Sequence, residues 1–62
     1  MTSTSIYAMA EAILQRHPSV NNPSYTWEES SRLLMLKAET EAEVKDSFEL
    51  LCLARMWNEK EN

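Results

Sequence analysis

Glycine is absent from the sequence, and proline occurs only at Pro18 and Pro23. Tight hairpin turns between strands favour glycine, because glycine adopts positive φ without steric cost. The absence of glycine also excludes the glycine-rich loops that bind phosphate groups. The composition therefore favours an all-α fold over a sheet.

Cysteine and histidine occur once each, as Cys52 and His17. A single cysteine excludes an intrachain disulfide. Cys52 lies in the apolar run LLCLA (residues 50–54), where a free thiol behaves as a small hydrophobic side chain, so we expect it to be buried. Neither residue belongs to a spaced ligand pair, and the carboxylates do not follow the calcium-loop pattern. We therefore expect no metal and no cofactor.

Basic residues are few, and the formal net charge is −4. The six lysines and arginines are scattered, whereas nucleic-acid binding depends on clustered basic residues that neutralise phosphates. The longest aliphatic run, residues 33–36, is far shorter than the roughly 20 residues of a membrane-spanning helix. The first residues lack the basic segment of a secretory signal. We expect a cytoplasmic protein that binds no membrane, and direct nucleic-acid binding is disfavoured.

Apolar spacing predicts a single small helical domain over residues 1–62, starting with a short helix over about residues 5–17. Its apolar face has the spacing i, i+3, i+4, i+7, i+8 that places side chains on one side of a helix. This face consists of Ile6, Met9, Ala10, Ile13 and Leu14. Pro18 ends the helix because the residue before a proline avoids helical geometry. Residues 18–25 (PSVNNPSY) form a loop, and residues 59–62 a frayed tail.

Two further helices are expected over about residues 27–38 and 41–58. Thr26 and Glu29 have the spacing of a capping box, and Glu28 and Arg32 that of an i, i+4 ion pair. Residues 40–43 (TEAE) form a second capping box, which favours a break near Glu39–Thr40 and a helical hairpin. The alternative is one long helix from residue 27 to residue 58, because residues 37–45 contain no helix breaker.

The helix over residues 41–58 is apolar on two sides. One stripe contains Val44, Phe48, Leu51 and Cys52, and the opposite stripe contains Leu50, Leu53, Ala54 and Trp57. A helix that is apolar nearly all round is expected to be buried all round. We expect Trp27 and Phe48 in the core, since each lies on the main stripe of its helix.

The size of the chain limits how much of this apolar surface it can cover. A domain of this length buries only about 60% of its unfolded surface, so we expect self-association, most simply a homodimer, to complete the fold. Dimer and higher oligomer stay open as alternatives. The predicted interface consists of Leu33, Leu36, Leu50, Leu53, Met56 and Trp57.

No catalytic constellation is recognisable. Ser30, Ser31 and Ser47 lie on predicted helices without a nearby histidine, and His17 follows a helix end, where a polar or cationic residue is common. We therefore expect no enzymatic activity, no catalytic residues and no small-molecule substrate.

The layout of HPSVNNPSYTWEESSRLLMLKAE leading into VKDSFELLCLARMW resembles that of the small early accessory proteins of lambda-like temperate phages. The resemblance extends over residues 6–57 and assigns a role to no single residue. It implies a phage or prophage protein that acts in the bacterial cytoplasm by binding host or phage proteins. We therefore expect a non-enzymatic protein–protein interaction module that modulates a partner. The alternatives are a nucleic-acid-associated transcriptional regulator and a small subunit of a larger complex.

Overall fold

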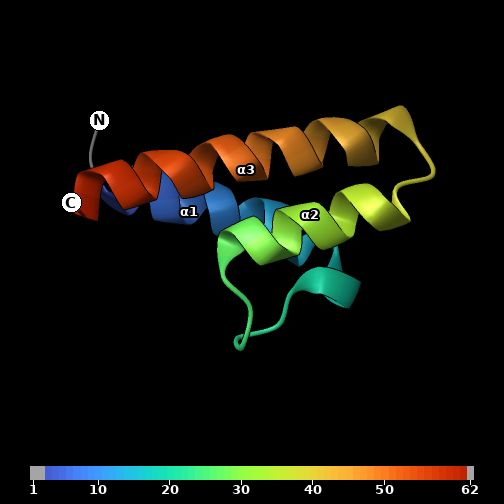
Figure 1. Ribbon diagram of the computed structural model, residues 1–62, viewed down its shortest axis with the longest axis horizontal. Coiled ribbons are helices and arrows are strands. Elements are labelled where there is room, and N and C mark those ends of the chain that lie inside the picture. The colour runs from blue at the N-terminus through green and yellow to red at the C-terminus, as the bar shows by residue number, and fades with distance from the viewer. Residues whose placement is uncertain (1–2, 62) are drawn as a thin grey trace.

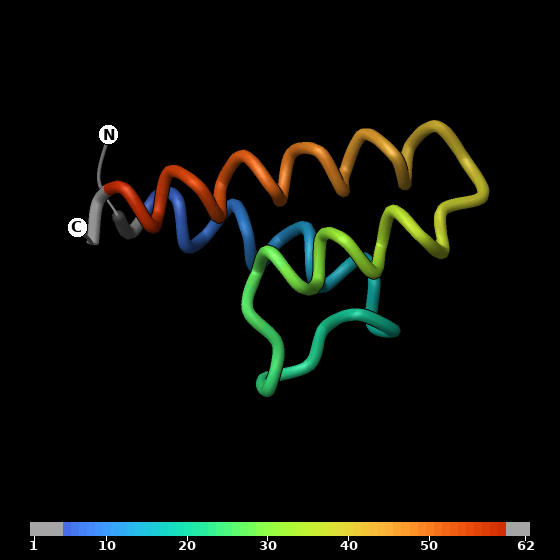
Figure 2. The backbone as a smooth tube through the Cα atoms, viewed as in Figure 1, coloured from blue at the N-terminus to red at the C-terminus, as the bar shows by residue number. Residues whose placement is uncertain are grey.

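Three α-helices and one short 3₁₀-helix make up the fold. The computed structural model describes the backbone of residues 3–61 and the side chains of residues 5–59. Along the chain, the elements are α1 (Ser3–Gln15), η1 (Pro18–Val20), α2 (Trp27–Lys37) and α3 (Glu41–Glu61) (Figure 1). All regular structure in these residues is helical, so the predicted all-α class is confirmed. The backbone trace shows α3 running back along both α1 and α2 (Figure 2).

The end of α1 lies two residues before its predicted position. The amides of Arg16 and His17 donate to the carbonyls of Ile13 and Leu14 over 3.1 Å and 3.0 Å, which tightens the last turn. His17 then takes an extended φ of −133°, as expected before Pro18. Pro18 itself begins η1, because its fixed φ suits the first position of a helical turn.

The predicted break near Glu39–Thr40 is confirmed, because α2 ends at Lys37 and α3 starts at Glu41. Thr40 Oγ1 accepts a hydrogen bond from the Glu43 amide over 3.2 Å, and the Glu43 carboxylate accepts from the Thr40 amide over 3.1 Å. The Glu39 amide also donates to this carboxylate, over 2.9 Å, and this bond contributes most to holding the pKa of Glu43 below its ordinary value. The capping interactions therefore start α3 as a separate helix.

The first capping box and the predicted surface ion pair are also present on α2. Thr26 accepts from the Glu29 amide over 3.1 Å, and Glu29 accepts from the Thr26 amide over 2.8 Å. Arg32 and Glu28 form an ion pair at 2.6 Å.

The helix α3 continues through Glu61, three residues beyond its predicted end at about residue 58. The residues after Trp57 include two glutamates and a lysine, which are good helix formers, and no breaker. The remaining part of the predicted tail, residue 62, lies outside the described residues.

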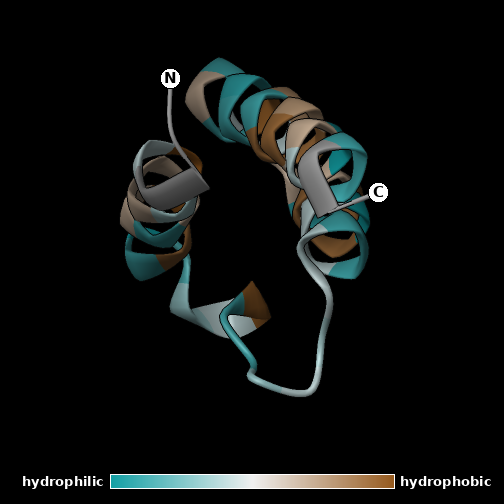
Figure 3. Cartoon of the chain, turned by 90° about the vertical axis from the view of Figure 1, so that its left-hand side faces the viewer, coloured by the Kyte–Doolittle hydropathy of each residue, from teal (hydrophilic) through white to brown (hydrophobic). Residues whose placement is uncertain are grey.

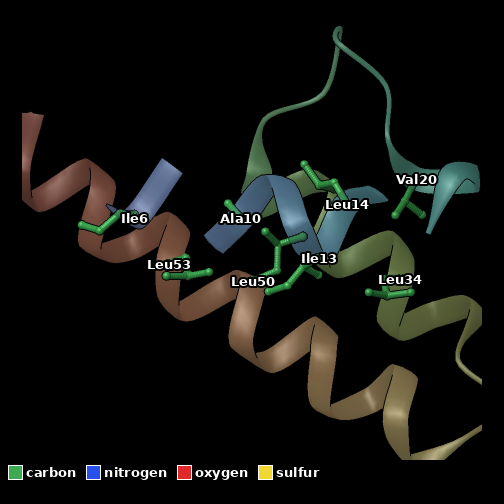
Figure 4. Close-up of a cluster of buried hydrophobic side chains, with 8 residues drawn as sticks. All are labelled: Ile6, Ala10, Ile13, Leu14, Val20, Leu34, Leu50 and Leu53. Atoms are coloured by element: carbon green, nitrogen blue, oxygen red, sulfur yellow. The ribbon is translucent and has the colours of Figure 1, made fainter. Parts of the chain in front are cut away.

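A single apolar core lies where the helices meet. The predicted apolar face of α1 is buried except at Met9, which is 42% exposed. Val20 of η1 and Leu34 of α2 join this core, and Leu50 and Leu53 point into it from α3 (Figure 4). Viewed end-on, α1 lies on one side of the α2–α3 pair, and the chain over residues 18–26 connects the two sides (Figure 3). The α2–α3 hairpin is thus covered by α1 on one face.

Three serines on α2 and α3 are buried. Ser30 Oγ donates to the Val20 carbonyl over 2.9 Å, which ties η1 to α2. Ser31 on α2 and Ser47 on α3 donate to carbonyls of their own helices, each over 2.7 Å. A hydroxyl that bonds its own helix can be buried without an unsatisfied polar group. The three hydroxyls are therefore buried with their hydrogen bonds satisfied.

Candidate functional site

Two of the predicted interface residues lie in the core of the single chain. Leu50 is fully buried and Leu53 is 3% exposed. The prediction that they line a dimer interface is wrong, because α1 already packs on their side of α3 (Figure 4). A side chain with no exposed area cannot gain further burial from a second chain.

Trp57 belongs to an aromatic cluster that joins all three helices. Its ring centroid lies 5.3 Å from that of Trp27 and 5.9 Å from that of Tyr7, and Tyr7 and Trp27 are 5.5 Å apart. Both tryptophans are half-buried against the core, so the expectation of Trp27 in the core is met in part. Trp57 therefore contributes to the packing of the single chain.

Tyr7 lies next to Ile6, outside the predicted α1 stripe, and its side chain is 47% exposed, so it belongs to the aromatic cluster and not to the core. No spacing signal in α1 identifies it, since its contacts come from Trp27 and Trp57, which are distant in sequence.

A hollow of about 380 Å³ opens beside this cluster and is lined by further groups including Tyr25 and Glu28. Aromatic rings around a carboxylate suggest the recognition of an organic cation. However, centroid separations of 5.3–5.9 Å are those of rings in direct contact, so the rings fill the space between themselves. The geometry supports a structural role for the cluster.

The most exposed large apolar side chains lie along the seam between α2 and α3. Leu36 is 82% exposed and Phe48 is 57% exposed, the largest exposed fractions among the large hydrophobic side chains of the described residues. Both line an open hollow of about 590 Å³. Its full lining is Ser31, Arg32, Met35, Leu36, Ser47, Phe48, Leu51 and Arg55.

A second hollow, of about 620 Å³, continues toward the loop between the helices. It is lined by Ala38, Glu39, Thr40, Glu41, Val44, Lys45 and Phe48. Phe48 lines both hollows, so the two adjoin at its side chain, and we call them together the α2–α3 groove. This groove is the candidate functional site.

The expectations for Phe48 and Cys52 are wrong, because both are exposed. Both belong to the stripe that also contains Val44 and Leu51. Phe48 and Cys52 are exposed on this stripe, and Val44 and Leu51 are half-buried, whereas the opposite stripe is buried at Leu50, Leu53 and Ala54. The sequence signalled a second apolar stripe on α3, but it did not indicate which stripe the chain itself covers.

The other predicted interface residues are divided between three environments. Leu36 lines the α2–α3 groove, Leu33 is half-buried against the core, and Met56 is 42% exposed outside the groove lining. Leu36 is thus the one member of the predicted set that the structure places in the groove. The groove residues that the prediction omitted include Phe48, Leu51 and Arg32.

The ionisable side chains that follow α1 link it to α3. His17 Nε2 lies 2.7 Å from Asp46 Oδ2, and Arg16 reaches the same carboxylate at 3.3 Å. The hydrogen bond with His17 lowers the pKa of Asp46 most, Arg16 lowers it further, and partial burial opposes both. The described residues contain no cluster of three or more histidine, cysteine or carboxylate side chains that could hold a metal ion.

Comparison of the chain with protein-family models, with curated proteins and with solved structures found no match. None of the described helices is both long enough and apolar enough to cross a membrane.

Proposed function

We propose that the chain is a non-enzymatic protein–protein interaction module whose binding surface is the α2–α3 groove. The exposure of Leu36 and Phe48, which line the same hollow between α2 and α3, carries this proposal. Large apolar side chains that gather in a concave surface are typical of protein contact sites, whereas single scattered ones are ordinary.

The groove lining also has the composition of an interface. Phenylalanine, methionine and arginine are enriched at protein interfaces, and Phe48, Met35, Arg32 and Arg55 are all present here. The resemblance to small phage accessory proteins supports a regulatory role for such a module, in which it binds a host or phage protein and modulates it.

The alternative of a nucleic-acid-associated regulator has less support. Arg16 pairs with Asp46 and Arg32 pairs with Glu28, so the positive charge of both residues is offset within the chain. The net charge of −4 would also repel phosphates at a distance. Neither feature favours contact with a nucleic-acid backbone.

Site-specific photocrosslinking in cells that express the full chain tests the proposal. A photoreactive amino acid at position 48 should yield a discrete crosslinked product, identified by mass spectrometry, because a bound protein would cover this position. The yield should fall several-fold when Leu36→Ser is added, since that change disrupts the same groove. A photoreactive residue in place of Ser19, which is exposed on η1 and absent from the groove lining, serves as the control.

A specific product at position 48 that depends on Leu36 supports the proposal whether the captured chain is another protein or a second copy. Equal crosslinking from positions 48 and 19, or none from position 48, would overturn it.

A further inference from the structure

We infer that the occupant of the α2–α3 groove is a second copy of this chain, related to the first by a two-fold axis that passes beside Phe48. The inference rests on the proposed function, because it names the partner that the same groove would bind. It is carried by the order of charges along the groove.

The two ends of the groove carry opposite kinds of side chain. Arg32 and Arg55 line one end, on facing helices, and no carboxylate lines that hollow. Glu39 and Glu41 line the other end, where Lys45 is also present. Exposed apolar side chains, above all Leu36 and Phe48, lie between the two ends. The groove therefore runs from basic through apolar to acidic.

Along α3, the oppositely charged ends of the groove lie at equal distances from Phe48. On α3, Glu41 lies seven residues before Phe48 and Arg55 lies seven residues after it. Seven residues are close to two helical turns, about 10.5 Å, so all three lie on one side of the helix at equal spacing. A two-fold axis beside Phe48 exchanges the two ends and places Arg55 of each copy opposite Glu41 of the other.

The charges on the other wall follow the same order, with Arg32 on α2 and Glu39 in the loop that follows α2. Arg32 and Glu39 are seven residues apart, and their midpoint lies between Met35 and Leu36. Because α2 and α3 run in opposite directions, Arg32 lies at the Arg55 end and Glu39 at the Glu41 end (Figure 2). A contact that uses the same patch on both copies requires such self-complementarity. The groove has it on both walls.

The main charged side chains that the axis would pair are free to form ion pairs with a second copy. Arg55 and Glu41 make no ion pair among the described residues, whereas Arg32 is partly neutralised by Glu28. Lys45 reduces the charge of the acidic end. The axis places Lys45, three residues before Phe48, opposite Leu51 of the second copy and not opposite Arg55, so it introduces no repulsion there.

Other occupants fit this order of charges less well. An acidic peptide would match the arginines but meet Glu39 and Glu41 at the other end, and a basic peptide would meet the opposite conflict. A parallel second copy would place Arg55 against Arg55, which is unfavourable. The antiparallel copy satisfies both ends, and it would join two hairpins into a four-helix arrangement with α1 on each outer face.

Sedimentation of the purified full chain over a range of concentrations tests the inference. We expect a reversible monomer–dimer equilibrium. Phe48→Ala should raise the dimer dissociation constant by roughly 30-fold or more, as truncation of a central interface anchor does. Met9→Ala is the matched control, because Met9 is comparably exposed on α1 and lies away from the groove lining. Circular dichroism should show unchanged helix content in both variants.

Charge exchange tests the register. Arg55→Glu and Glu41→Arg should each weaken the dimer roughly tenfold, and the double variant should recover most of the loss. The same register brings Val44 of one copy level with Cys52 of the other, since they lie four residues to either side of Phe48. Val44→Cys should therefore form a covalent dimer under mild oxidation. Within one chain, positions 44 and 52 are about 12 Å apart along α3, too far for a disulfide.

A wild-type chain that sediments as a monomer at every concentration would overturn the inference. A double charge variant no more associated than the single variants would do the same, as would a covalent dimer formed equally well by Cys52 alone. A monomer whose position 48 still crosslinks to a different protein in cells would retain the proposed function and reject only the second copy.

Discussion

His17 Nε2 and Asp46 Oδ2 lie 2.7 Å apart, and this contact joins the segment that follows α1 to the first half of α3. The His17 side chain is 13% exposed and the Asp46 side chain 16% exposed, so water competes little for the bond. Arg16 approaches the same carboxylate with two nitrogens, each at 3.3 Å, but its side chain is 54% exposed. The histidine contact is therefore the stronger link between the two helices.

Replacement of Asp46 by asparagine should lower the free energy of unfolding by about 1–2 kcal/mol at pH 7, as loss of a charge-assisted hydrogen bond does. The pKa of Asp46 is lowered from 3.8 in the folded state. The stabilisation from the Asp46 carboxylate is therefore fully present above its ordinary pKa of 3.8. It is lost as the pH falls through the lower pKa of the folded state. The stability difference between wild type and Asp46→Asn should narrow on acidification, as measured by urea unfolding.

Arg16→Ala is the matched comparison for the same carboxylate. We expect a cost of about 0.5 kcal/mol or less, because exposed ion pairs contribute little. If the stability difference between wild type and Asp46→Asn did not change as the pH fell, the charge of the carboxylate would not be its origin.

Trp57→Ala should destabilise the monomer by about 2–3 kcal/mol. The change removes a half-buried ring that contacts both Tyr7 and Trp27, and tryptophan truncations in cores cost about 3–5 kcal/mol. Urea unfolding at a fixed low protein concentration measures the effect. The neighbouring Met56→Ala removes an exposed side chain that is absent from the core cluster, and it should change stability by about 0.5 kcal/mol or less.

The local structure of this chain was largely predictable from its sequence. Both capping boxes, the Glu28–Arg32 ion pair and the break between α2 and α3 depend on residues within four positions of one another. The apolar face of α1 was equally readable, because α1 packs on one side only. Interactions of such short range depend on residues that are neighbours in the sequence, so the sequence predicts them directly.

The location of the candidate site was not predictable in the same way. Two apolar stripes on α3 were visible, but the choice between them depends on where α1 and α2 pack. Leu50 and Phe48 differ by only two positions, yet Leu50 is fully buried and Phe48 is 57% exposed. Contacts between residues distant in sequence decide this difference, as they do for Tyr7 in the aromatic cluster. On α3, the predicted interface was therefore placed on the side with Leu50, which the chain itself covers, and not on the side with Phe48.

Ser30→Ala should cost about 1 kcal/mol. Ser30 is buried, and its hydroxyl is a donor to the Val20 carbonyl at 2.9 Å, which anchors η1 against α2. The Val20 carbonyl also accepts from the Asn22 amide over 3.2 Å, so the substitution does not leave it without a partner. The cost should therefore stay near the average for a buried hydrogen bond. The exposed Ser19→Ala is the control in the same unfolding assay, with an expected change near zero.

Thr40→Ala distinguishes the two shapes that the sequence allowed. In the broken hairpin, Thr40 Oγ1 caps α3 by accepting from the Glu43 amide, and loss of such a cap costs about 1 kcal/mol. In a continuous helix over residues 27–58, the same position would be internal, and alanine would stabilise the chain by a few tenths of a kcal/mol as the better helix former. The sign of the change in unfolding free energy therefore separates the two, whatever its size. Thr26→Ala calibrates the measurement, because Thr26 caps α2 in either case and its loss should destabilise the chain. A stabilising Thr40→Ala beside a destabilising Thr26→Ala would contradict the hairpin, and with it the groove that α2 and α3 form.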